Sequence, residues 1–99
     1  MAPTRCGSVP AIEIAKYTAE HGLDVARAHC MKTGGFVDLL GTSDAIEVCD
    51  RAAAGDKAAA RAWDAMVYQI CKWIGEMACV LKGDVDGILL GGGMVHSKE

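Results

Sequence analysis

The longest regular pattern in the chain covers about residues 57–82 and predicts a long amphipathic helix. Asp56 stands just before this stretch, where a carboxylate can cap the first helical turn, and Gly83 follows it, where glycine suits a left-handed helix end. Apolar residues recur within it at steps of three and four. They are Trp63, Met66, Val67, Ile70, Ile74, Met77, Ala78 and Leu81. Charged residues follow the opposite side, so the predicted helix is too polar to span a membrane.

The predicted long helix is apolar on more than one side, because Trp73 and Val80 lie outside its main apolar line. Two explanations stay open. The second apolar side is either a surface for a partner, or it reflects an exposed tryptophan without consequence.

Three shorter helices are predicted before the long one, over about residues 11–20, 24–31 and 44–55. Pro10 suits the first position of the first helix, and Asp24 suits the cap of the second. Asp44 followed by Glu47 is typical of a helix start in which the cap residue and the third helical residue pair reciprocally. Glycines follow each stretch and end the predicted helices.

A short apolar run near the C-terminus, at residues 87–90, predicts a buried strand because Ile88, Leu89 and Leu90 show no polar alternation. The backbone of such a strand needs a neighbour for its hydrogen bonds. Only residues 36–40, a short strand or a packed loop, offer one, and a two-stranded pair is marginal. We therefore expect a mostly α fold with one or two short β-strands, in which residues 1–99 form a single partial domain of a larger protein.

The run leads directly into Gly91, Gly92 and Gly93. Glycines permit positive φ and the close approach of a ligand, and exposed amides after a strand suit anions such as phosphate. A plain strand exit explains the same three residues, and from these residues alone it is the better explanation.

Charge and cysteine content exclude some classes of function. The net charge is −3 without a basic cluster, which gives no electrostatic footprint for nucleic-acid binding. Five cysteines, an odd number without C-x-x-C spacing, follow no apolar leader, so we expect reduced thiols in a cytoplasmic protein. Three histidines scatter without ligand spacing, which disfavours a zinc site. By pattern alone, Arg5 is a solvated arginine near the terminus.

Five segments, taken together, resemble a known family. They are residues 5–10 (RCGSVP), 39–45 (LLGTSDA), 63–70 (WDAMVYQI), 81–90 (LKGDVDGILL) and 92–97 (GGMVHS). In this order and spacing they resemble the C-terminal domain of the butyrate kinase branch of the acetate kinase family. The resemblance covers nearly the whole chain.

The resemblance implies an enzyme that transfers a phosphoryl group reversibly between ATP and a short-chain carboxylate, butanoate, with Mg²⁺. It implies two ribonuclease H-like α/β domains of the actin-like ATPase type, a nucleotide between them, and a homodimer. Arg5 matches a catalytic arginine that stabilises charge on the transferring phosphoryl group. The implied nucleotide-binding residues are Asp44, Ala45, Ile46, Gly91, Gly92, Gly93, Met94 and His96.

Two residues depart from the family pattern, since Gly91 replaces a usual threonine and Ile46 a common arginine. The family's N-terminal domain, with its catalytic acid, metal ligands and acyl pocket, is expected outside this chain. Three hypotheses follow. The chain is part of a butyrate kinase and inactive alone, or it acts only as an oligomerising module, or it retains weak ATP binding.

Overall fold

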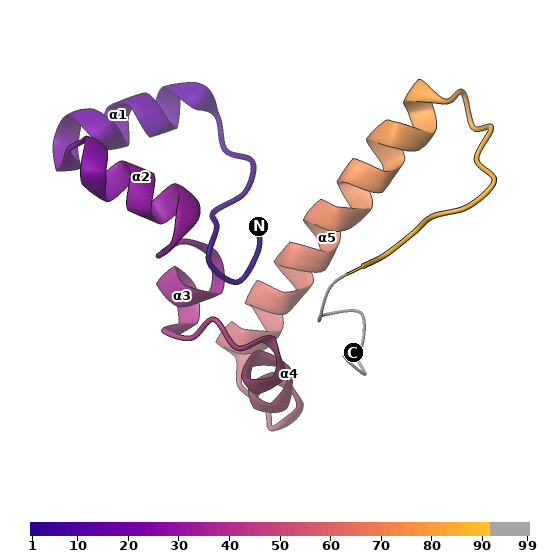
Figure 1. Ribbon diagram of the computed structural model, residues 1–99. Helices are drawn as coiled ribbons and strands as arrows, with labels where there is room; N and C mark the ends of the chain where they lie inside the picture. Colours follow the sequence, from indigo (N-terminus) through magenta and orange to yellow (C-terminus); the bar gives the residue numbers. More distant parts are fainter. Residues whose placement is uncertain (92–99) are drawn as a thin grey trace.

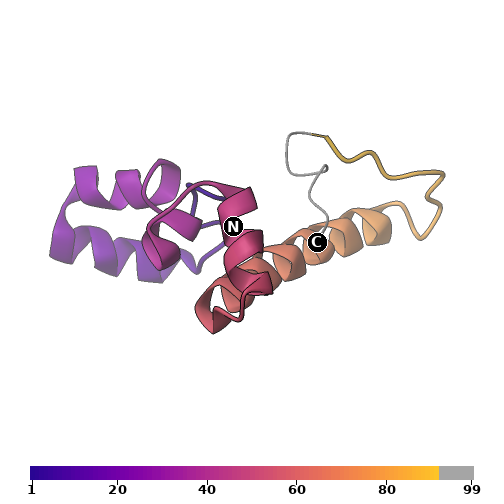
Figure 2. The ribbon, with the colours of Figure 1, turned by 90° about the horizontal axis from the view of Figure 1, so that it is seen from below.

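The computed structural model describes residues 1–91, which form five helices (Figure 1). The helices are α1 (Ala11–His21), α2 (Leu23–Met31), α3 (Gly35–Leu40), α4 (Ala45–Ala53) and α5 (Lys57–Val80). In Figure 1, α1 and α2 form an antiparallel pair on one side, and α5 extends away on the other. α3 and α4 lie between them, and α4 packs against the beginning of α5 (Figures 1 and 2).

The two predicted aspartate caps are confirmed. The Asp44 carboxylate accepts from the amides of Ile46 and Glu47 at 2.9 and 3.4 Å. The Asp56 carboxylate accepts from the first-turn amides of α5 at 3.0 and 3.2 Å. These bonds satisfy N–H groups that have no partner inside a helix.

The predicted reciprocal pairing of Glu47 with Asp44 is wrong. The Glu47 carboxylate instead accepts from the Thr42 hydroxyl at 2.8 Å, and the Asp44 amide donates to the same hydroxyl oxygen at 3.1 Å. Thr42 therefore stands between the two residues, and its hydroxyl serves both because it can donate and accept at once.

Two other helix starts differ from the prediction by a residue or two. Pro10 precedes α1 with extended backbone angles, so it caps the helix from outside. Gly22 links α1 to α2 with a φ of 91°, and Asp24 lies in the first turn of α2 without a capping bond. The positive φ of Gly22 allows α2 to turn back directly along α1, because glycine has no Cβ to clash.

The buried core lies where the N-terminal segment, α3, α4 and the first half of α5 meet. Its buried side chains are Met1, Phe36, Val48, Ala59, Ala62, Trp63 and Met66. The rings of Phe36 and Trp63 stack with centroids 6.2 Å apart. The second half of α5 contributes no buried residue.

Residues 36–40 form neither a strand nor a loop but part of α3. Phe36 is fully buried, and Leu40 packs against the same core one helical turn later. The segment before α3 fits closely against the N-terminus, where the Gly34 amide donates to the Thr4 carbonyl at 3.2 Å. Gly35 has a φ of 59°, and a Cβ there would overlap the Ala2 carbonyl, so the position requires glycine.

The predicted buried strand at residues 87–90 is also wrong for this chain. These residues have no regular structure, and the Leu89 side chain is 98% exposed. The physical reason is that the only expected partner, residues 36–40, is a helix packed in the core. Within residues 1–91 the only β pairing is an isolated bridge between Ala2 and Arg5, so the mostly α prediction is confirmed and the short strands are not.

The end of α5 is confirmed to within two residues. The helix ends at Val80, and the Gly83 amide closes its last turn by donating to the Ala78 carbonyl at 2.9 Å. Gly83 has the predicted left-handed backbone, with a φ of 79°. None of the helices in residues 1–91 combines the length and the apolar character needed to cross a bilayer.

Candidate functional site

Arg5 presents an exposed guanidinium on an anchored backbone. Its main chain pairs with Ala2, with N···O distances of 3.1 and 3.4 Å, and the adjacent Thr4 carbonyl accepts from the Gly34 amide before α3. The guanidinium itself has no ion pair or hydrogen bond to any residue in the described range 1–91. An arginine held in this way is available to an anionic ligand, because its charge and its fork of donors are not used within the fold.

The segment Asp44, Ala45 and Ile46 forms the beginning of α4. The Asp44 carboxylate occupies the amides of Ile46 and Glu47, so these two N–H groups are not open to a phosphate. Ala45 packs against the core, whereas the Ile46 side chain is 69% exposed. This segment therefore presents one exposed apolar side chain, that of Ile46, at a capped helix start.

The predicted glycine turn lies at the border of the described structure. At Gly91 an added Cβ would meet no atom within 4 Å, so a side chain such as threonine has room there. The predicted site residues Gly92, Gly93, Met94 and His96 lie outside the described residues.

The predicted site residues within the described range lie on three separate segments of the chain. Arg5 lies beside the start of α3, and Asp44 follows the end of α3. The helix between them is about 9 Å long, at 1.5 Å per residue. Gly91 ends the segment that turns back along the second half of α5 (Figures 1 and 2). No hydrogen bond or ion pair within residues 1–91 joins the three, so the described chain offers separate components rather than a closed pocket.

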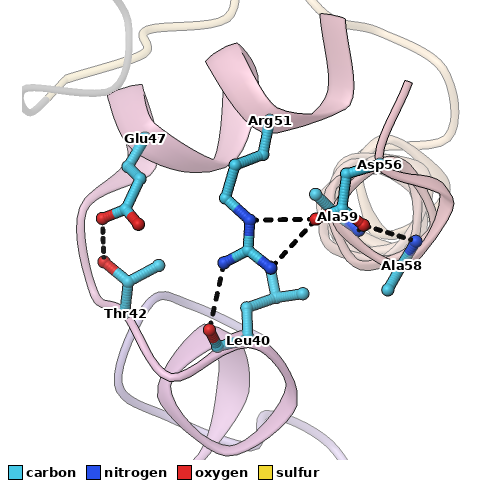
Figure 3. A network of polar contacts seen from close by, with 7 residues as sticks. All are labelled: Leu40, Thr42, Glu47, Arg51, Asp56, Ala58 and Ala59. Atoms are coloured by element: carbon cyan, nitrogen blue, oxygen red, sulfur yellow. Dashed lines mark hydrogen bonds and ion pairs between the residues drawn. The ribbon is translucent and has the colours of Figure 1, made fainter. Parts of the chain in front are cut away.

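Sequence analysis missed a polar cluster around Arg51, which lies on the helix that begins after Asp44. Arg51 lies near the end of α4, and its Nη1 donates to the Leu40 carbonyl at 3.1 Å (Figure 3). Its Nε donates to the Asp56 carboxylate at 3.0 Å, and its Nη2 lies 2.9 Å from the same carboxylate. It thereby joins the end of α3, the end of α4 and the cap of α5. The Asp56 pKa is lowered by hydrogen bonds from the Ala59 amide and from Arg51. A basic residue five positions before a predicted aspartate cap was the available signal.

The exposed side of α5 forms an apolar groove with the returning tail. The groove has a volume of about 380 Å³. Its lining includes Ile70, Trp73, Met77, Leu81, Val85 and Ile88. Trp73, predicted to lie off the main apolar line, is 41% exposed and lines this groove.

The described residues form a helical unit with an exposed arginine, a capped helix start at Asp44 and an exposed apolar tail. Comparison with known proteins gives the family. The model described as the acetokinase family matches residues 1–97, and the chain belongs to this family.

Curated relatives are named as butyrate kinases. The "Probable butyrate kinase 2" of Caldanaerobacter subterraneus subsp. tengcongensis is 46% identical over 98 residues, covering 97% of this chain and 28% of the relative. A "Probable butyrate kinase" of Clostridium botulinum is 40% identical over 97 residues, covering 96% of this chain and 27% of the relative. The "Probable butyrate kinase" of Elusimicrobium minutum is 36% identical over 111 residues, covering 99% of this chain and 30% of the relative.

The resemblance seen in the sequence is therefore confirmed. The chain spans less than a third of the length of these relatives.

Proposed function

We propose that this chain is the C-terminal, nucleotide-site portion of a butyrate kinase, an enzyme that transfers a phosphoryl group reversibly between ATP and butanoate. The observation that carries the proposal is the family match over residues 1–97, which includes every segment assigned to the site. Relatives named butyrate kinase match nearly the full chain.

In this proposal Arg5 stabilises the negative charge that the phosphoryl group carries during transfer. Its support is the unused, exposed guanidinium on a loop tied to α3. Phosphoryl transfer depends largely on placing fixed positive charge around the transferring oxygens. Among residues 1–91 no group of three His, Cys, Asp or Glu side chains is placed to hold a metal ion.

The proposed nucleotide contacts come from the start of α4 and from the glycine turn. The exposed Ile46 side chain offers an apolar surface to the adenine ring, and Gly91, Gly92, Gly93, Met94 and His96 form the turn that approaches the adenosine. The full enzyme is proposed to have two ribonuclease H-like domains and to form a homodimer. In this chain the apolar side chains of Ile88, Leu89 and Leu90 are exposed, which leaves them open to a covering segment of the full enzyme.

A chimera tests the proposal directly. The matched segment of the Caldanaerobacter relative is replaced by this chain, and butanoyl phosphate formed from ATP and butanoate is trapped as the hydroxamate. We expect an active chimera whose kcat falls at least ~100-fold in the Arg5→Ala variant, the scale of loss for a fixed transition-state charge. Arg61→Ala, which removes an exposed arginine on α5, is the matched control and should leave kcat unchanged. Equal activity of the two variants would contradict the role of Arg5.

An oligomerising or weakly nucleotide-binding module is the second candidate for the chain alone. The apolar groove beside α5 and the exposed tail favour it, since both can be covered by another copy. The chain alone is expected to form no butanoyl phosphate. A sedimentation mass of one chain at micromolar concentration would oppose the oligomer, and a flat calorimetric titration up to millimolar Mg-ATP would oppose residual nucleotide binding.

A further inference from the structure

Two cysteines far apart in the sequence meet directly beside Arg5. Cys6 follows Arg5 in the N-terminal loop, and Cys30 lies in the last turn of α2. The backbones of these segments converge at Gly34, where an added Cβ would lie 2.7 Å from the Cys6 amide nitrogen and would overlap the His29 carbonyl oxygen. The Cys6 and Cys30 thiols are neighbours there, since Cys30 is one of the causes that raise the pKa of the Cys6 thiol.

The Cys6 thiol is open to small solutes. It lines a pocket of about 440 Å³ together with Val9, Tyr17 and His29, and both Cys6 and Cys30 are half-buried. Burial and the neighbouring Cys30 raise the pKa of the Cys6 thiol, so Cys6 forms less of the nucleophilic thiolate. Because Cys6 is the weaker nucleophile, we assign the first reaction with peroxide to Cys30. Cys6 then attacks the oxidised Cys30 and forms the disulfide.

We propose that Cys6 and Cys30 form an oxidation site that closes a reversible intramolecular disulfide when hydrogen peroxide is present. The Cys30 thiolate attacks one peroxide oxygen, the O–O bond breaks, and Cys30 becomes a sulfenic acid as hydroxide leaves and takes up a proton as water. The Cys6 thiol then attacks the Cys30 sulfur, the S–O bond breaks, and a second water leaves. With hydrogen peroxide, two thiols and one peroxide give one disulfide and two waters.

The disulfide would fasten the loop that carries Arg5 to the end of α2. Closing this cross-link restricts the unfolded chain, so the oxidised form should unfold at a higher temperature than the reduced form. A consequence for phosphoryl transfer rests on the function proposed above for Arg5, whereas formation of the bond does not.

Peptide mapping tests the proposal on the 99-residue chain carrying C71S and C79S, which removes the two exposed cysteines of α5. After stoichiometric hydrogen peroxide and non-reducing tryptic digestion, we expect residues 6–16 linked to residues 28–32, lighter by two hydrogen atoms and separated by dithiothreitol. The peptide that carries Cys49 should stay unlinked. Absence of the 6–16 to 28–32 link, or a dominant link to the Cys49 peptide, would overturn the proposal.

Single variants test the order of attack. With C6S added, Cys30 should accumulate a sulfenic acid that dimedone traps, whereas with C30S added, Cys6 should be labelled much less. Equal labelling in the two variants would reject the assigned order. Because every readout is a mass, failure of this proposal is distinguishable from failure of the kinase proposal, which is measured as butanoyl phosphate.

Discussion

The two halves of α5 make different use of the same kind of sequence. The first half, from Lys57 to Met66, is capped by Asp56, tied to α4 through Arg51 and packed into the core. The second half has the same three- and four-residue apolar spacing, yet it has no buried residue and faces a groove. The spacing of apolar residues predicts a helix, but the availability of a covering segment decides whether the apolar face is buried.

This contrast separates a part of the chain whose apolar side chains cover one another from a part whose apolar side chains are exposed. The N-terminal loop, α3, α4 and the first half of α5 supply one another with partners. The second half of α5 and the tail to Gly91 leave apolar side chains exposed, among them Met77, Val80 and Leu89. Arg5 and Asp44 belong to the part with the buried core, whereas Gly91 belongs to the exposed part. This division explains why the described residues do not form a closed site.

The largest expected difference in stability is between Phe36 and Leu89. Phe36 is fully buried against Trp63, so Phe36→Ala should lower the free energy of unfolding by about 3–5 kcal/mol. Leu89→Ala removes a side chain that is 98% exposed and should change it by less than about 0.5 kcal/mol. Urea unfolding followed by circular dichroism measures both. Similar losses in the two variants would show that the tail is packed in solution.

A smaller effect is expected from Gly35, which ties the N-terminal loop to α3. Gly35→Ala places a methyl group against the Ala2 carbonyl at a positive φ, and we expect a loss of more than about 2 kcal/mol. Gly41→Ala is the matched control, because Gly41 also has a positive φ, 75°, but an added Cβ there meets only open space. Gly41→Ala should lower the free energy of unfolding by about 1 kcal/mol, because only the left-handed backbone conformation opposes the alanine. If the two costs were equal, the close contact with Ala2 would not matter.

The Arg51 cluster should make stability depend on pH in the acid range. The folded-state pKa of Asp56 lies below its unfolded value, so the stabilisation is fully present above the ordinary aspartate pKa of about 3.9 and is lost as the pH falls through the folded value. Arg51→Met removes one cause of the shift and should reduce the loss of melting temperature on acidification. Asp24→Asn changes an exposed aspartate in the first turn of α2 and is the control. An unchanged acid slope in Arg51→Met would contradict the importance of the pair.

The sequence predicted local features better than tertiary ones. Asp44 and Asp56 were identified as caps because capping depends on amides two or three residues away. The state of residues 36–40 and 87–90 depended on segments distant in the sequence. Phe36 became helical because the N-terminal loop and Trp63 enclose it, and Leu89 stayed exposed because no strand reached it.

The candidate site shows the same limit. The family resemblance pointed to Arg5 and Gly91 as site residues. It did not reveal what holds the Arg5 loop, which is a hydrogen bond from the Gly34 amide to the Thr4 carbonyl, thirty positions away. The Arg51 cluster was missed because Arg51 and its two partners, Leu40 and Asp56, belong to the ends of three different helices. The pairing of Cys6 with Cys30 was invisible for the same reason, since neither residue has a cysteine nearby in the sequence.

The smallest effect in stability is expected from Trp73, and its comparison with Trp63 gives the sharpest view of the contrast within α5. Trp63 is 9% exposed and Trp73 is 41% exposed, although they stand ten residues apart on one helix. Trp73→Phe leaves only Trp63, whose fluorescence should be blue-shifted and resistant to acrylamide, with the free energy of unfolding changed by less than about 0.5 kcal/mol. Trp63→Phe leaves only Trp73, whose emission should be red-shifted and readily quenched. If Trp73 were instead protected, and became accessible on dilution, a second copy of the chain would cover the groove, and the exposed half of α5 would be the contact surface of an oligomer.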